Sequence, residues 1–215
     1  MAFLERDLQY EREQFLGLTT LEAARKIVKL NPKIQTVFLR PYRYVKGKIG
    51  GIGEERFPWE RQDFTSGNLV SEFIENFGGG YNFALDSSVL LTNGRRGHFA
   101  MIDFNVSKSE EAKEKIIQKL NELIVPFYGG GLLLETGKSY HFLGFDIFDE
   151  RCFSRFVGRA LLTGSVIITP SNVPNDYEHL VDVRYLGHSL LRGTTGLRIT
   201  AGERKTTTPR VIEVI

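Results

Sequence analysis

Three segments of the chain carry polar side chains whose types and spacing could bind a metal ion and phosphate groups. The first is the apolar run AMIDFN, which contains Asp103 and Asn105. Residues two apart on a strand point to the same side, and carboxylate and amide oxygens are ligands for divalent cations. A strand-end aspartate held by ordinary hydrogen bonds fits the same residues. The pair therefore indicates either a divalent-metal site or a structural strand end.

The second segment is the turn TGKS, residues 136–139, with His141 at the start of the apolar run that follows. A Gly-containing turn can present backbone N–H groups to an anion, and Lys138 adds a positive charge. His141, two residues after Ser139, could donate a hydrogen bond to a phosphate group. A plain hairpin turn with a half-buried histidine is the alternative interpretation.

The third segment, VDVRYLGHSLLRGTTGLR, places Asp182 in an apolar run ahead of spaced basic residues. We expect a strand, a short element and a second strand here, so that Asp182 lies on a strand beside the other two segments. Cationic and hydrogen-bonding groups spread in this way would suit a triphosphate or a nucleic-acid backbone. Arginines on an ordinary surface are the alternative. The basic and polar groups concerned are Arg184, His188, Arg192 and Arg198.

The elements that position these groups follow from the apolar and polar pattern of residues 81–163. Residues 81–106 predict a hairpin, because Asn-Gly stands between two β-rich runs. The run SKSEEAKEKIIQKLNEL predicts a helix with Ser107 or Ser109 as its N-cap, followed by a turn at 125–131. Residues 132–148 predict two strands joined by the TGKS turn, and a helix capped by Asp149 follows. We expect an antiparallel sheet with helices on one face.

The first part of the chain is richer in helix. Residues 3–16 and 21–30 predict two amphipathic helices, the second capped by Thr19 or Thr20. Residues 34–45 are β-rich, and Pro41 indicates an edge or a break in that strand. Residues 46–68 read as a loop and 68–77 as a short helix. The change in character predicts a boundary near residue 80.

Composition and charge set broad limits on the class of protein. The chain has 215 residues, a net charge of +2 and one cysteine, Cys152. This length suits one large domain or two small ones. A single cysteine excludes an intrachain disulfide and a cysteine-based metal cage, and it is typical of a reducing cytosol, so we expect a cytoplasmic protein. With neither a signal-peptide pattern at the start nor a run of eighteen apolar residues, we expect no membrane association.

The three segments, in this order, resemble the motifs of the archaeo-eukaryotic primase superfamily, which includes primase-polymerases. The resemblance covers roughly residues 98–200 and rests on AMIDFN, TGKSYHF and VDVRYLGHSLLRGTTGLR. It implies an α+β fold, in which an N-terminal helix-rich α/β unit (residues 1–80) packs on an RRM-like antiparallel sheet with helices (residues 81–215).

The resemblance also implies a function, that of a nucleotidyltransferase acting on a nucleoside triphosphate and a DNA or RNA strand. Mg²⁺ or Mn²⁺ would be held by Asp103, Asn105 and Asp182, of which Asp103 and Asp182 would be catalytic. Asn105 stands where the superfamily usually has a second acid, so a nucleotide- or nucleic-acid-binding protein of the same fold without catalysis is the alternative. An unrelated α+β protein is another. The residues expected to bind the nucleotide are Lys138, Ser139, His141, Arg184, His188 and Arg192.

Overall fold

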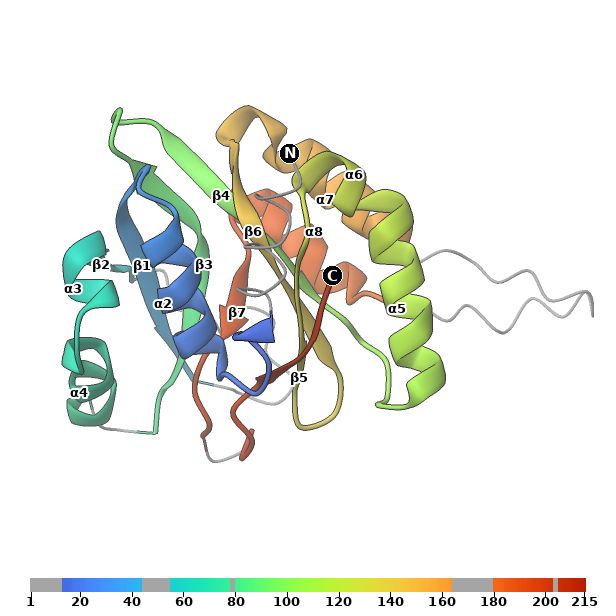
Figure 1. Cartoon of the computed structure of the whole chain (residues 1–215), viewed down its shortest axis with the longest axis horizontal. Helices are drawn as coiled ribbons and strands as arrows, with labels where there is room; N and C mark the ends of the chain where they lie inside the picture. Colours follow the sequence, from blue (N-terminus) through green and yellow to red (C-terminus); the bar gives the residue numbers. More distant parts are fainter. Residues whose placement is uncertain (1–12, 44–54, 78–79, 164–179, 203–204) are drawn as a thin grey trace, which may run out of the picture.

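One antiparallel sheet of eight strands organises the molecule in this computed structural model, which describes residues 13–43, 55–77, 80–163, 180–202 and 205–215 (Figure 1). The strand order is β2-β1-β3-β4-β6-β5-β8, and β7 pairs with β3 beside this path. Helices cover the sheet, so the expected α+β class is confirmed. Most of the predicted helix at 3–16 lies outside the described residues, as does the first part of the loop expected at 46–68.

The bounds of the elements are as follows. The strands are β1 (Ile34–Tyr42), β2 (Phe57–Glu60), β3 (Asn82–Leu91), β4 (Arg96–Asp103), β5 (Gly131–Glu135), β6 (Tyr140–Asp149), β7 (Gly196–Arg198) and β8 (Arg210–Val214). The helices are α2 (Thr20–Leu30), α3 (Arg61–Thr65), α4 (Leu69–Asn76), α5 (Glu110–Leu123), α6 (Val125–Tyr128), α7 (Phe153–Thr163) and α8 (Val183–Arg192), and a short 3₁₀ helix, η1 (Glu150–Cys152), precedes α7.

Local signals in the sequence account for most of these boundaries. Thr19 and Glu22 form a capping box at the start of α2, and the Ser109 hydroxyl accepts a hydrogen bond from the Ala112 amide at the start of α5. A turn at residues 92–95, which contains Asn93-Gly94, joins β3 to β4, and the TGKS turn joins β5 to β6. Pro41 lies beyond the part of β1 that pairs with β2, where a missing N–H breaks no described ladder.

Two apolar cores lie on opposite faces of the sheet. Along β4, Phe99 and Met101 belong to one core, and Ala100 and Ile102 belong to the other. The first core takes in buried residues of α2, α3 and α4, and the second takes in those of α5, α7 and α8. In Figure 1, α2–α4 accordingly lie beside β1 and β3, and α5–α8 gather on the other side. The helices after residue 80 therefore share one face, as expected.

Three local expectations were wrong. The loop predicted at 46–68 contains β2 and α3, because β2 completes the sheet beside β1 and its aromatic side chains pack on α4. The turn predicted at 125–131 contains one helical turn, α6. The strand predicted at Asp182 is instead the start of α8. Asp182 is the N-cap of this helix, and Gly193, in a left-handed conformation at φ 69°, ends it.

The sheet forks at β3. Residues Ser88–Leu90 of β3 pair with β4, whereas residues Ala84–Asp86 pair with β7. Beyond the fork, β4 continues beside β6 as far as the pair Asp103 and His141. The end of β4 and the strand β7 therefore face each other across an opening. Because β1 pairs with β3, the sheet also runs across residue 80, and the division into units 1–80 and 81–215 stays a prediction.

Among the helices that the structure describes, none has both the length and the apolarity that crossing a membrane requires.

Candidate functional site

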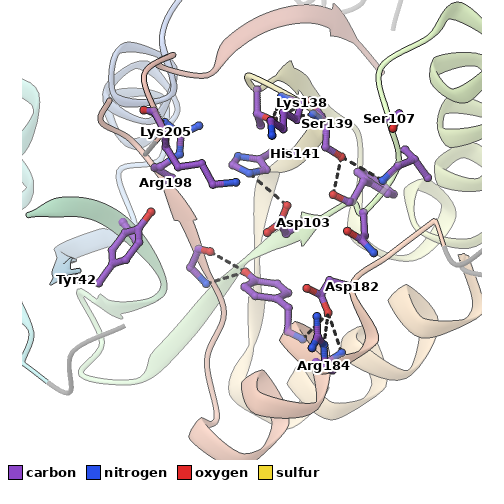
Figure 2. A pocket seen from close by; sticks show the side chains of 17 residues that line it. Tyr42, Asp103, Ser107, Lys138, Ser139, His141, Asp182, Arg184, Arg198 and Lys205 are labelled. Carbon is purple, nitrogen blue, oxygen red and sulfur yellow. Dashed lines mark hydrogen bonds and ion pairs between the residues drawn. The ribbon is translucent and has the colours of Figure 1, made fainter. Parts of the chain in front are cut away.

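A cavity of about 530 Å³ lies at the fork, between the end of β4, β7 and the start of α8 (Figure 2). All three segments singled out in the sequence reach it. The expected site residues that line it are Asp103, Asn105, Lys138, Ser139, His141, Asp182 and Arg184.

Asp103 and His141 face each other across the β4–β6 ladder. They are register partners, and Nε2 of His141 lies 3.4 Å from Oδ1 of Asp103. The His141 ring is buried, and its Nδ1 has no hydrogen-bond partner among the described residues. The Asp103 side chain remains 39% exposed, so its carboxylate is accessible from the cavity. The pair offers an accessible acid with a histidine fixed beside it.

Asp182 joins this pair through the backbone. The short segment that precedes α8 runs along the end of β4, where the Asn105 amide donates to the Leu180 carbonyl oxygen (2.8 Å). The Asp182 amide donates to the Asp103 carbonyl oxygen (3.4 Å). In its side chain, Oδ1 accepts hydrogen bonds from the amides of Arg184 (3.0 Å) and Tyr185 (3.2 Å). Helix capping therefore occupies one carboxylate oxygen and leaves Oδ2 for a ligand.

The TGKS turn is a closed hairpin turn, which agrees with the second of the two interpretations of this segment and not with a backbone open to an anion. Oγ1 of Thr136 accepts from the amides of Lys138 (3.4 Å) and Ser139 (3.0 Å). The Ser139 hydroxyl donates to the Phe104 carbonyl oxygen (2.6 Å) and accepts from the Val106 amide (3.3 Å). Ser139 therefore holds residues 104–106, which include Asn105, against the TGKS turn. Lys138 provides a cationic side chain at the cavity wall.

The basic residues of α8 divide into two groups. Arg184 lies in the first turn and lines the cavity, whereas His188 and Arg192 do not line it. A helix rises about 1.5 Å per residue, which carries Arg192 about 12 Å along the axis from Arg184. We expected Arg184, His188 and Arg192 to reach one ligand from a bent strand. Because they lie on a helix instead, Arg184 and Arg192 are too far apart along its axis for that.

Several cavity residues were not identified in the sequence as part of the site. Tyr42 comes from β1, Tyr185 from α8 and Lys205 from the segment after β7. Tyr185 donates its hydroxyl hydrogen to the Gly196 carbonyl oxygen (2.7 Å) and accepts from the Gly196 amide (3.0 Å). Burial raises the pKa of both tyrosines, so their hydroxyls stay protonated. The interleaved basic and aromatic residues around Tyr42 were the available signal in the sequence.

Arg198 of β7 also lines the cavity, but its Nη1 donor is already used. This nitrogen donates to the carbonyl oxygens of Thr200 and Thr207, each at 2.6 Å. Burial lowers the pKa of Arg198 below its usual value. Arg198 therefore supports the segment after β7 and adds positive charge to the cavity wall.

The donor atoms at the end of β4 suit a hard divalent cation, because they are carboxylate and amide oxygens. Asp103, Asn105 and Asp182 provide them and line one cavity. In the part of the chain that the structure describes, no group of three or more His, Cys, Asp or Glu side chains is arranged to hold a metal ion. Two carboxylates and one amide fit a single cation better than a pair.

Comparison with known proteins bears on this site. A family model described as archaeo-eukaryotic primase 1D-like (AEP-like) matches residues 62–210, which include all three segments. The resemblance drawn from the three motifs is confirmed. Comparisons with curated proteins and with solved structures gave no match.

Proposed function

Because the chain belongs to the archaeo-eukaryotic primase 1D-like family, we propose that it binds a nucleoside triphosphate with Mg²⁺ or Mn²⁺ in the cavity and transfers the nucleotidyl group to a DNA or RNA strand. The main support is the convergence on one cavity of acids, a histidine and cations from three distant segments. Such an enzyme would work in the reducing cytosol that the single cysteine predicts.

Positive and hydrogen-bonding groups would hold the triphosphate. Lys138 and Arg184 line the cavity from opposite elements, the β5–β6 turn and α8 (Figure 2). His141 lies between the turn and Asp103, where its Nε2 can turn from the carboxylate to a phosphate oxygen. Charge-assisted hydrogen bonds to phosphate are about twice as strong as neutral ones, so these three groups would supply most of the affinity for the triphosphate.

The oxygens of Asp103, Asn105 and Asp182 would hold the divalent cation. When bound, the cation would lower the pKa of the attacking hydroxyl group and offset charge on the phosphates. Asp103 is the main ligand in this proposal, because its carboxylate is accessible. Asp182 contributes the oxygen that does not cap α8, and Asn105 contributes a neutral carbonyl oxygen.

In nucleotidyl transfer, all bonds that form and break lie in the two substrates, and no further reactant is needed. The hydroxyl oxygen at the end of the strand forms a bond to the α-phosphorus, and the bond from that phosphorus to the bridging oxygen of the β-phosphate breaks. Pyrophosphate leaves, and the hydroxyl proton passes to solvent or to a nearby base. In this scheme Lys138, His141 and Arg184 orient the triphosphate for in-line displacement.

Binding without catalysis is a second candidate, and two features favour it. Asn105 replaces a charged ligand with a neutral one, and helix capping takes one oxygen of Asp182. Both features weaken cation binding, and transfer depends steeply on where the cation sits. In this case the cavity would bind a nucleoside triphosphate and leave it intact.

Two measurements on the full chain test these candidates. Extension of a labelled primer on DNA and RNA templates, with Mg²⁺ or Mn²⁺ and all nucleotides, tests transfer. Calorimetric titration with a nucleoside triphosphate and Mn²⁺ tests binding. Extension that is lost in Asp103→Asn supports transfer, and binding without extension supports the second candidate. Absence of both would reject both.

A further inference from the structure

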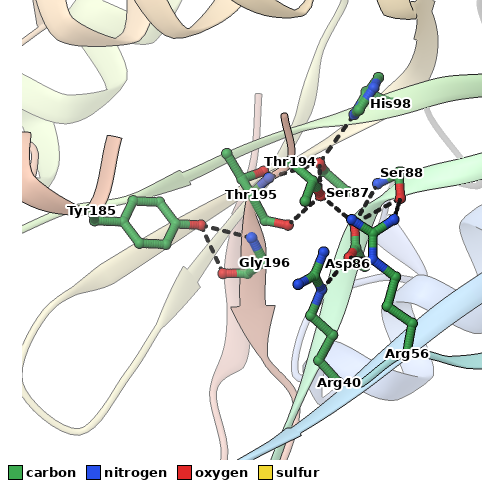
Figure 3. Close-up of polar contacts among 10 residues, drawn as sticks. All are labelled: Arg40, Arg56, Asp86, Ser87, Ser88, His98, Tyr185, Thr194, Thr195 and Gly196. Carbon is green, nitrogen blue, oxygen red and sulfur yellow. Dashed lines mark hydrogen bonds and ion pairs between the residues drawn. The ribbon is translucent and has the colours of Figure 1, made fainter. Parts of the chain in front are cut away.

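A second cluster of charged and hydroxyl side chains is buried outside the cavity, at the fork where β3 changes its neighbour from β4 to β7. Figure 3 shows this cluster around Asp86, with Arg40 and Arg56 directed toward its carboxylate. Asp86 is the register partner of Gly196, which lines the cavity, so the cluster and the cavity are neighbours at the fork. Arg40, Arg56 and Asp86 do not line the cavity, and the proposed nucleotidyl transfer does not use them.

Asp86 is already saturated with donors. Its Oδ2 accepts a hydrogen bond from Nε of Arg40 and lies 3.6 Å from Nε of Arg56. Its Oδ1 accepts from the amide (2.8 Å) and the hydroxyl (2.9 Å) of Ser88, and from the hydroxyl of Thr194. Asp86 therefore has little capacity to neutralise a further arginine.

Positive charge exceeds negative charge here. Arg192, at the end of α8, is a third arginine near Asp86. Burial lowers the pKa of Arg192, and the charges of Arg40 and Asp86 also act on it. Arg96 and Glu150, which lie near Arg56, pair with each other at 3.3 Å. Arg40 and Arg56 thus contact one buried carboxylate, and Arg192 lies within electrostatic range of it.

Two arginine donors of the cluster are buried without a hydrogen-bond partner among the described residues. They are Nη2 of Arg40 and Nε of Arg192. The Arg40 side chain is only 5% exposed, so bulk water cannot satisfy this group. A buried donor on a charged group is costly when it has no acceptor. An anion that accepts several hydrogen bonds would neutralise the excess positive charge and would also satisfy these two unpaired donors.

We propose that this cluster is a phosphate-binding site, in which Arg40, Arg56 and Arg192 together hold one phosphate group. Guanidinium groups suit phosphate because their planar N–H donors match two phosphate oxygens at once. The Arg56 side chain is 30% exposed and can be reached from solvent, whereas the Arg40 side chain is only 5% exposed. The phosphate is either the free ion or part of a nucleotide.

Titration of the full chain with inorganic phosphate, at constant ionic strength in chloride, tests the site. The variants are Arg56→Gln and Arg192→Gln, which alter the less buried arginines. Arg95→Gln, in the exposed β3–β4 turn, is the matched control, and Lys138→Gln reports on the cavity. The calorimetric titration curve gives the affinity. A rise of the melting temperature with phosphate concentration shows that phosphate binds the folded protein.

We expect the wild type and Arg95→Gln to bind phosphate alike, and we expect Lys138→Gln, which can lose only binding in the cavity, to keep the binding that the cluster variants weaken. Arg56→Gln and Arg192→Gln should each weaken binding about tenfold, the effect of one lost charge-assisted contact. Repeating the titration with ATP on the Lys138→Gln background identifies the source: ATP binding that Arg56→Gln weakens assigns the phosphate to a nucleotide, and binding of inorganic phosphate alone assigns it to the free ion.

Three results would overturn the site. They are absence of phosphate binding by the wild type, binding by both cluster variants that is as strong as that of the wild type, and loss of binding in Lys138→Gln with none in the cluster variants, which would place phosphate in the cavity. The proposed nucleotidyl transfer is judged separately by primer extension, so failure of either idea leaves the other standing.

Discussion

The amide of Asp182 donates a hydrogen bond to the carbonyl oxygen of Asp103, at 3.4 Å. This contact joins the start of α8 to the end of β4, so two acids far apart in the sequence lie at one edge of the cavity. Asp103 is also the register partner of His141. The end of β4 is therefore the point at which all three motifs meet, and changes there should affect function most directly.

Replacing Asp103 by asparagine should abolish primer extension. The substitution keeps the shape of the side chain and removes the most accessible carboxylate of the proposed cation site. Because misplacement of a reacting group by about 1 Å can cost about a hundredfold in rate, we expect a loss of at least about a hundredfold. Asp63→Asn, at an exposed position of α3, is the control and should keep full activity. Equal rates in both variants would contradict the role of Asp103.

The two histidines of the motifs should differ. His141→Gln should weaken nucleoside triphosphate binding roughly tenfold or more, because a hydrogen bond to a charged group is worth about 1.5–3 kcal/mol. His188→Gln should leave the affinity unchanged, since His188 does not line the cavity. Calorimetric titration of both variants measures the difference. The opposite ranking would show that α8 contributes more to the site than the β5–β6 turn.

Restoring an acid at position 105 should strengthen cation binding. Asn105→Asp adds a third negative charge to the oxygens of Asp103 and Asp182, and carboxylates are better ligands for Mg²⁺ and Mn²⁺ than amides. We expect about a tenfold gain in Mn²⁺ affinity, measured by calorimetry or by Mn²⁺ paramagnetic resonance. Asn93→Asp, in the β3–β4 turn, is the control for added charge. No gain over this control would argue against a cation at the end of β4.

Removing the Tyr185 hydroxyl should destabilise the fork. Tyr185→Phe loses both hydrogen bonds to the Gly196 backbone, at 2.7 and 3.0 Å. A buried polar group left without its partner costs about 1–3 kcal/mol, so the free energy of unfolding in urea should fall by that amount. Tyr81→Phe, at an exposed position, should change it by less than about 0.5 kcal/mol.

Stability should fall in acid through His98. This ring is fully buried, and burial lowers its pKa below the ordinary value of about 6.5, although Glu150 opposes the shift. Below about pH 6.5 the unfolded chain therefore binds a proton that the folded chain resists. The contribution of neutral His98 is complete above that pH and declines as the pH falls toward its folded pKa.

Urea unfolding between pH 5 and pH 8 measures this effect. His98→Gln removes the titrating group, so its free energy of unfolding should change less with pH below 6.5 than that of the wild type. An identical slope in the two proteins would assign the acid sensitivity to other groups.

Local patterns in the sequence predicted most of the elements that build this protein. The alternation of apolar residues predicted β3 to β6, and the capping residues Thr19 and Ser109 predicted the starts of α2 and α5. The order of the three motifs predicted the family. These features depend on residues close together in the chain. The two strands that carry Asp103 and His141 could therefore be predicted as neighbours, and the ladder between them is as expected.

Only the tertiary structure decided which of the remaining side chains line the cavity and which lie outside it. An aspartate before apolar residues can begin a helix or lie on a strand, and the caps at Asp182 and Gly193 made α8 a helix that takes Arg192 away from the cavity. The fork of β3 brought Tyr42 and Arg198 to the cavity and buried Asp86 among arginines. Long-range pairing of this kind depends on how whole strands compete for neighbours, which no short stretch of sequence specifies.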